Sequence, residues 1–232
     1  MRKAFFLLLF LAAAPISTIG TQALAESAIA APVEDFGKFL GNPQTEWNQD
    51  GRTMRLIKTF VYEDANGKDW TAPANSTIDG ASIPRIFWSI IGGPFEGEYR
   101  NASIVHDTEC QSHTHPWQDV HRMFYSASRA GGASEFKAKI MFAAVYHFGP
   151  RWPKPGETQA PPTSLQSEDD MLRTIALIRK NRDISIDAIQ GLSHLGLATQ
   201  VSDEDLASER RMMQEIQRQR LSGEPLVRFF YQ

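Results

Sequence analysis

The chain of 232 residues has very little cysteine: Cys110 is the only one. A single cysteine cannot form an internal disulfide, so a hydrophobic core has to stabilise the fold. The sequence also lacks an excess of positive charge, because 24 Lys and Arg stand against 27 Asp and Glu. Binding to nucleic acids depends on Lys and Arg contacts with phosphates. We therefore expect no nucleic-acid partner.

Long apolar runs are also scarce, and the one that is present lies at the N-terminus. A basic start at residues 2–3 precedes an apolar stretch over residues 4–15, and residues 23–25 (Ala-Leu-Ala) provide a small-x-small cleavage pattern. The stretch is shorter than the roughly 20 residues that span a bilayer. The sequence therefore predicts a cleavable signal peptide at residues 1–25, an exported protein (periplasmic or secreted), and no transmembrane anchor after cleavage.

β-Structure is predicted near the start of the mature chain. Residues 53–62 are rich in β-formers, Asn66-Gly67 is a strong hairpin signal, and residues 68–72 provide the return strand. Residues 26–50 are turn-rich and are expected to form an arm over the domain. A two-stranded unit should therefore come first.

Helical periodicity follows the hairpin. It predicts helices at residues 98–110, 117–130 and 134–148, each ended by a breaker or a polar loop, and a short segment from Pro84 to Ile91 before them. Because sheet and helix segments are separate along the chain, we expect a mainly helical α+β fold in which a short N-terminal β-hairpin packs on a three-helix core.

The C-terminal third is more polar. Five prolines in residues 150–166 indicate a linker, and further helices are expected at 168–181, capped by Ser167, and at 203–220, capped by Ser202 or Asp203. The predicted organisation is a signal peptide, a core domain, a Pro-rich linker and an accessory helical region, with the bounds 1–25, 26–152, 153–166 and 167–232. The accessory helices would pack on the core or on a partner.

The side chains that could carry chemistry lie between Asp79 and His121. Asp79, Gly80 and Ser82 belong to a tight structural turn before the helices. Residues three and four apart share a helix face, which aligns His106 with Cys110. The loop at 113–116 is short enough to make the flanking helices antiparallel neighbours. His106 and His121 are therefore expected to meet.

Two chemistries and one structural role fit this cluster. His106 could act as a general base towards water, with Asp107 holding a hard cation such as calcium through oxygen ligands. Alternatively, His106, Asp107 and His121 could bind a transition metal such as zinc directly. In the structural role, the histidines are hydrogen-bonded core residues, and Cys110 is a small buried hydrophobe.

The run from Asp79 to Trp152 resembles a bacterial and phage family known as domain of unknown function 1353. The matching residues are the segment 79–85 (Asp-Gly-Ala-Ser-Ile-Pro-Arg), Phe87-Trp88, Gly93-Pro94, Tyr99, Val105-His106-Asp107, Arg122, Phe124 and Tyr146 to Gly149. The resemblance covers about 100 residues and leaves the region from about 160 onward uncovered. The family name implies no activity.

The same helices are distantly similar to bacterial secreted phospholipase A2. That similarity implies that His106 is the general base and that Asp107 is a calcium ligand. The family's second-helix Asp falls at His121, three residues before Phe124. A histidine there cannot orient His106 as a carboxylate does, although it could form a metal-binding pair.

Three hypotheses follow for the function. The first is an envelope hydrolase (esterase-like, phospholipase-like or metal-assisted) centred on His106, Asp107 and His121. The alternative is a non-catalytic periplasmic structural or assembly protein whose C-terminal helices bind a partner. The third is lipid binding through the segment 87–91. Possible partners are accordingly lipid, a cell-envelope component or another envelope protein.

Overall fold

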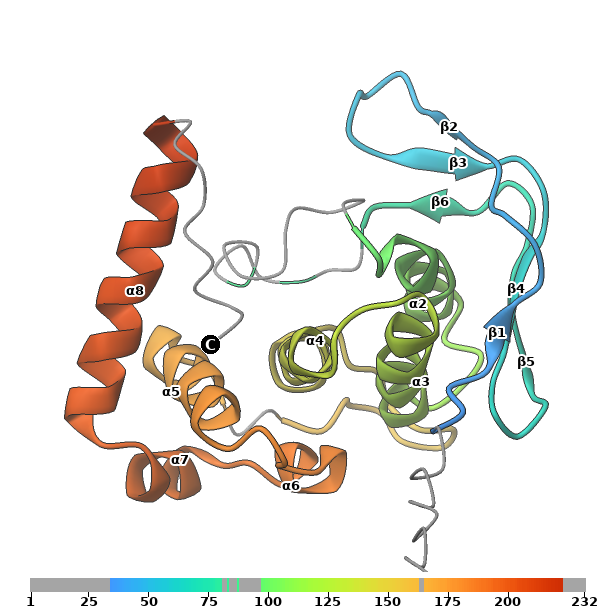
Figure 1. The fold of residues 1–232 in the computed structure, drawn as a ribbon. Coiled ribbons are helices and arrows are strands. Elements are labelled where there is room, and N and C mark those ends of the chain that lie inside the picture. The colour runs from blue at the N-terminus through green and yellow to red at the C-terminus, as the bar shows by residue number, and fades with distance from the viewer. Residues whose placement is uncertain (1–33, 81–82, 84–86, 88–96, 163–164, 223–232) are drawn as a thin grey trace, which may run out of the picture. The chain divides into compact units, whose positions relative to one another are not determined.

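A computed structural model describes residues 34–80, 83, 87, 97–162 and 165–222 (Figure 1). The described residues from Asp35 onward form one compact unit. The predicted signal peptide, Ser82 and all but Phe87 of the segment 84–91 lie outside the described residues. In the part of the chain that the structure describes, no helix is long and apolar enough to cross a membrane.

The predicted hairpin turn and return strand are confirmed, but the first strand, expected over residues 53–62, is divided into β3 (Met54–Leu56) and β4 (Phe60–Glu63) in different sheets. β4 (Phe60–Glu63) pairs antiparallel with β5 (Asp69–Ala72). In the turn between them, Asp64 Oδ1 accepts hydrogen bonds from the backbone N–H groups of Asn66 and Lys68, and Gly67 takes a φ of 77°. A positive φ is easily adopted by glycine, which explains why the Asn-Gly pair predicts this turn correctly.

The β-structure is larger than the predicted two-stranded unit. β1 (Lys38–Phe39) adds to β4, which gives a three-stranded sheet in the order β1-β4-β5. A second sheet has the order β2-β3-β6, built from Thr45–Trp47, Met54–Leu56 and Thr77–Ile78. Part of the predicted arm over residues 26–50 is therefore β-structure.

Three helices form the centre of the fold, as predicted: α2 (Arg100–Ser112), α3 (Trp117–Ala130) and α4 (Glu135–Phe148). Figure 1 shows the two sheets on one side of these helices and the C-terminal helices on the other. The two sides share one core, which contains Phe60 and Ile78 from the sheets together with Phe124 and Phe142 from the helices.

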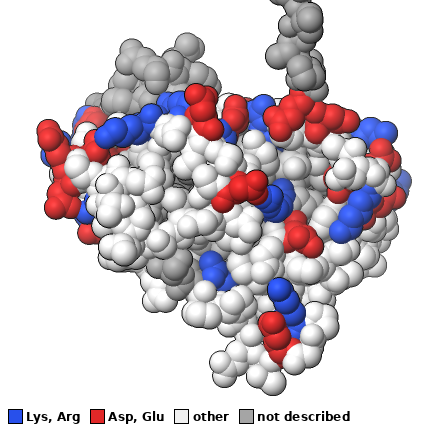
Figure 2. All heavy atoms as spheres, turned by 90° about the horizontal axis from the view of Figure 1, so that it is seen from below, with Lys and Arg blue, Asp and Glu red and all other residues white. Residues whose placement is uncertain are grey.

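The C-terminal region contains α5 (Glu168–Lys180), α6 (Ile186–Gln190), α7 (His194–Gln200) and α8 (Asp203–Ser222). It packs on α4, where buried Lys139 donates to the Arg182 carbonyl over 2.6 Å. Ion pairs join α5 to α8, with Arg179–Glu209 as the most buried of those described. On the face seen in Figure 2, acidic and basic side chains are interspersed.

Ser167 caps α5, as predicted. Its side chain accepts a hydrogen bond from the Asp170 backbone N–H over 3.0 Å, and the Asp170 carboxylate accepts one from the Ser167 backbone N–H over 3.2 Å. We expect Ser167→Ala to lower the free energy of unfolding by about 1 kcal/mol, because it removes an N-cap. Urea denaturation measures the change. Ser208→Ala, at an exposed position inside α8, is the control, and equal losses in both variants would contradict the prediction.

Candidate functional site

The structure brings His106 of α2 and His121 of α3 into direct contact. His106 Nε2 lies 2.9 Å from His121 Nδ1, and both side chains are fully buried. The Phe124 ring packs on His106 with its centroid 4.6 Å away, and the Trp117 ring lies 5.6 Å from the His121 ring. The two histidines thus form a polar contact that is surrounded by aromatic side chains.

The tautomers of the two rings follow from a third group. His121 Nε2 lies 3.0 Å from the carbonyl oxygen of Pro150, which can only accept a hydrogen bond. His121 Nε2 must therefore carry the proton, which leaves a lone pair on Nδ1 of the neutral ring. His106 Nε2–H then donates to that lone pair, and the unprotonated nitrogen of His106 is Nδ1. This chain of two hydrogen bonds fixes both rings.

Burial keeps both imidazoles neutral. It lowers the pKa of His106 to about 3, against a small opposing effect of the Asp79 charge. Burial also lowers the pKa of His121, with the neighbouring His106 and Arg151 acting in the same direction. Because neutral imidazoles can bind a metal ion through their lone pairs, the two nitrogens that share the hydrogen bond between His106 and His121 would become ligands if the proton between them left.

Asp107 lies on the other side of the His106 ring from His121. Its Oδ2 accepts hydrogen bonds from the backbone N–H groups of Asp79 (3.1 Å) and Gly80 (2.8 Å). Its Oδ1 lies 3.9 Å from His106 Nδ1. The carboxylate therefore connects the 79–80 turn to the far side of the His106 ring and does not enter the gap between the two histidines. Asp79 is exposed as a whole residue, but partial burial of its carboxyl group, together with the charge of Asp107, raises its pKa.

Cys110 completes the cluster. Its sulfur lies 3.7 Å from His106 Nε2 and 3.8 Å from His106 Nδ1. The ligand atoms of His106, Cys110 and His121 all lie within 4.8 Å of one another. The spacing of four residues between His106 and Cys110 is the sequence signal for this contact, although the cysteine alone suggests only a small core residue.

His113 and His115, in the loop between α2 and α3, both make side-chain contacts. His113 stacks on Trp152 with ring centroids 4.6 Å apart. His115 Nδ1 lies 2.9 Å from the buried carboxylate of Glu109. Both residues line a pocket of about 380 Å³ together with Trp117 and Trp152. Because these two tryptophans also contact the His121 ring, this pocket adjoins the histidine pair.

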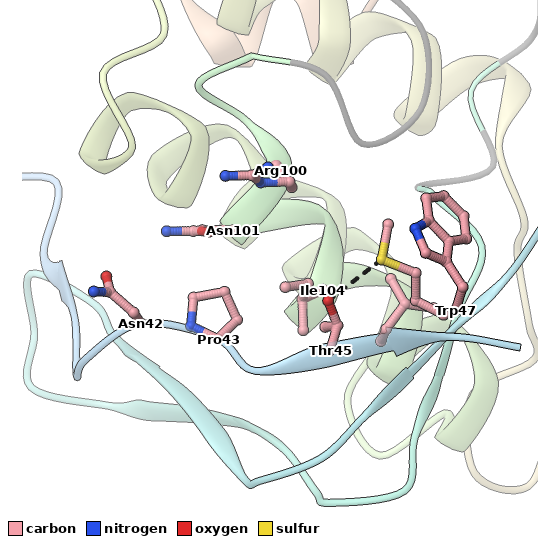
Figure 3. Close-up of a pocket in the computed structure, with 9 residues that line it drawn as sticks. Asn42, Pro43, Thr45, Trp47, Arg100, Asn101 and Ile104 are labelled. Atoms are coloured by element: carbon pink, nitrogen blue, oxygen red, sulfur yellow. Dashed lines mark hydrogen bonds between the residues drawn. The ribbon is translucent and has the colours of Figure 1, made fainter.

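A larger pocket of about 480 Å³ lies between the sheet β2-β3-β6 and α2 (Figure 3). Its lining residues come from β2, β3, β6, the loop before β2 and the N-terminal half of α2: Asn42, Pro43, Thr45, Trp47, Met54, Ile78, Arg100, Asn101 and Ile104. Neither His106 nor His121 lines either pocket. The smaller pocket adjoins the pair because Trp117 and Trp152, which line it, contact the His121 ring.

Fold and site together define a small α+β domain built around a buried histidine pair. Residues 54–145 match the family model "Protein of unknown function (DUF1353)", which is the family that the sequence resembles. The similarity to phospholipase A2 stays a prediction.

Two relatives come from Sinorhizobium fredii (strain NBRC 101917 / NGR234). The "Uncharacterized protein y4jT" is 44% identical over 127 residues, which cover 54% of this chain and 38% of the relative. The "Uncharacterized protein y4iH" is 42% identical over 99 residues, which cover 42% of this chain and 41% of the relative. The chain thus matches about two fifths of the length of these relatives. No solved structure matches the chain significantly.

Proposed function

We propose that this domain is a hydrolase that activates water at the His106–His121 pair. The observation that carries the proposal is the hydrogen-bonded chain from the Pro150 carbonyl through His121 to His106. Burying polar groups costs free energy that apolar side chains would not cost. Buried groups with strongly shifted pKa values are also concentrated at functional sites. Burial makes each imidazole a weak base, so the oriented pair is better suited to holding an ion that polarises water than to taking a proton from water directly.

The adjoining 380 Å³ pocket supports the proposal, because it offers a place for a substrate beside the pair. The Trp117 indole N–H has no hydrogen-bond partner among the described residues, although the side chain is buried. Trp117 also lines the pocket, although its N–H is itself buried. The predicted export makes carboxylic esters, including envelope lipids, the substrate class to test first.

Hydrolysis of p-nitrophenyl esters and of phospholipid vesicles tests this function. We expect His106→Gln and His121→Gln to lower the rate at least about 100-fold, the usual contribution of a positioned acid–base group. His194→Gln is the matched control, because His194 lies in α7 with a side chain that is 70% exposed. Circular dichroism and urea denaturation identify any variant that fails to fold.

Two results would overturn the proposal. One is an absence of hydrolysis in the parent protein over the whole panel; the other is full activity in both histidine variants. If the parent protein hydrolyses nothing and both variants are less stable than the parent, the histidine pair is a hydrogen-bonded part of the core. The non-catalytic alternative then holds.

A further inference from the structure

We infer that His106, His121 and Cys110 together bind a divalent transition metal ion of the zinc class. The three donor atoms are His106 Nε2, His121 Nδ1 and Cys110 Sγ, from two neighbouring helices. They lie within 4.8 Å of one another and are inside the fold. The inference extends the proposed hydrolase, but binding can be measured without turnover.

The distances between the donor atoms are close to those of a tetrahedral site. Zn–N bonds of 2.0–2.1 Å and Zn–S bonds of 2.3 Å place two nitrogens about 3.3 Å apart and a nitrogen and a sulfur about 3.6 Å apart. The observed separations are 2.9 Å between the two nitrogens and 3.7 Å between Cys110 Sγ and His106 Nε2. The third separation, between Cys110 Sγ and His121 Nδ1, is at most 4.8 Å. Admitting the ion therefore requires a small opening between the histidines and, where the third separation exceeds about 3.6 Å, a closer approach of Cys110 to His121.

The second nitrogen of each ring supports the same assignment. Histidines that bind metals usually donate their other N–H to a carbonyl or a carboxylate, which fixes the orientation of the ring. His121 Nε2–H donates to the Pro150 carbonyl over 3.0 Å. His106 Nδ1 lies 3.9 Å from Asp107 Oδ1, which is too long for a hydrogen bond. Asp107 is held by two backbone N–H groups, and a shift of about 1 Å would let it accept from a protonated His106 Nδ1. Asp107 is therefore a positioning residue and not a ligand.

The donor set determines the class of ion. A thiolate and two imidazoles suit zinc, cobalt and similar metals, whereas Ca²⁺ takes six to eight oxygen ligands. Binding converts the Cys110 thiol to a metal-bound thiolate and releases its proton to solvent. The proton on His106 Nε2 leaves as that atom binds, and Nδ1 takes one up, so each ion releases one proton net. Three protein ligands leave a fourth position for water, as in catalytic zinc sites.

Titration of the metal-free full-length protein with Co²⁺ tests the site. We expect the intense visible bands of four-coordinate Co²⁺, a thiolate-to-cobalt charge-transfer band in the near ultraviolet, and loss of both when Zn²⁺ displaces Co²⁺. Because Cys110 is the only cysteine, a charge-transfer band can come from no other residue. Cys110→Ser should abolish that band, and His121→Gln should weaken Zn²⁺ binding by more than 100-fold. Asp107→Asn should weaken it on the order of 10- to 100-fold.

The control and the readouts keep the two proposals apart. His194→Gln, outside the cluster, should bind Co²⁺ as the parent protein does. A parent protein that gives no charge-transfer band with Co²⁺, or a Cys110→Ser variant with an unchanged spectrum, overturns the metal site even if esters are hydrolysed. Stoichiometric Co²⁺ binding without hydrolysis supports the metal site and overturns only the proposed hydrolase. The parent spectrum decides the matter even if a variant fails to fold.

Discussion

Acidification from pH 7 to about pH 4.5 should strongly destabilise the metal-free protein. Burial lowers the pKa of His106 to about 3 and also lowers the pKa values of His121 and His147. In the unfolded chain these side chains bind protons near the ordinary value of about 6.5. The unfolded state therefore binds more protons below that pH, and the stability falls as the pH is lowered from about 6.5 towards 3. His106 alone accounts for roughly 4 kcal/mol over the full range.

The neighbouring charges support this direction of change. The Asp79 carboxylate only partly opposes the effect of burial on His106, while Arg151 acts with burial on both His121 and His147. Carboxylates whose pKa values lie below their usual range, such as Asp64 and Asp170, are protonated only at lower pH, so their contribution to stability is lost there. The interval between pH 6.5 and 4.5 therefore reports mainly on the buried histidines.

Urea denaturation followed by tryptophan fluorescence, at several pH values and with a chelator present, measures the dependence. His147 Nε2–H donates to the Ile189 carbonyl over 2.7 Å, and a glutamine can keep that bond. His147→Gln should therefore fold and show a shallower fall of stability with acid. His113→Gln, at an exposed position, should keep the fall of the parent protein. A stability that stays level from pH 7 to 4.5 would contradict the expectation.

The long helices could be predicted from sequence because their apolar periodicity is strong and is bounded by breakers. α3 begins at Trp117 and ends before Gly131, as the pattern predicts. The structure adds α6 and α7, which have five and seven residues. Such segments are too short to show a helical period. They depend on the caps Ser185 and Ser193 and on packing of Ile189 and Leu197 in the core.

The strands that the sequence did not predict have a similar explanation. β1 and β2 are two and three residues long, and only tertiary pairing defines them. A two-residue segment cannot show the alternation that identifies a strand. The hairpin of β4 and β5 could be predicted because its turn carries a local signal.

The site shows the same difference between local features, which could be predicted, and long-range contacts, which could not. The meeting of His106 and His121 could be expected from helix spacing and a short loop, because both are local properties. The partner of His121 is the Pro150 carbonyl, 29 residues away, and those of Asp107 are the backbone N–H groups 27 and 28 residues before it. Contacts with backbone groups so far away along the chain depend on no particular residue type, so the amino-acid sequence gives no sign of them. Sequence reasoning therefore placed the cluster but not the orientation of Asp107.

Replacing Glu209 by alanine should lower the free energy of unfolding by about 3 kcal/mol, the range expected for breaking a buried ion pair. Arg179 of α5 donates from Nε and Nη2 to the two carboxylate oxygens of Glu209, each over 3.0 Å. The Glu209 side chain is only 3% exposed and that of Arg179 is 18% exposed. The substitution therefore removes a two-point acceptor from a largely desolvated guanidinium at the interface of α5 and α8.

Two comparisons separate this effect from a general loss of charge in α8. Glu215 pairs with Arg218 on the exposed side of α8, so Glu215→Ala should change the stability by less than about 1 kcal/mol. The double replacement Arg179→Met with Glu209→Met should recover most of the loss, because an apolar pair of similar size needs no buried partner charge. Urea denaturation measures all three variants. Equal losses in Glu209→Ala and Glu215→Ala would mean that the α5–α8 contact depends on apolar packing alone.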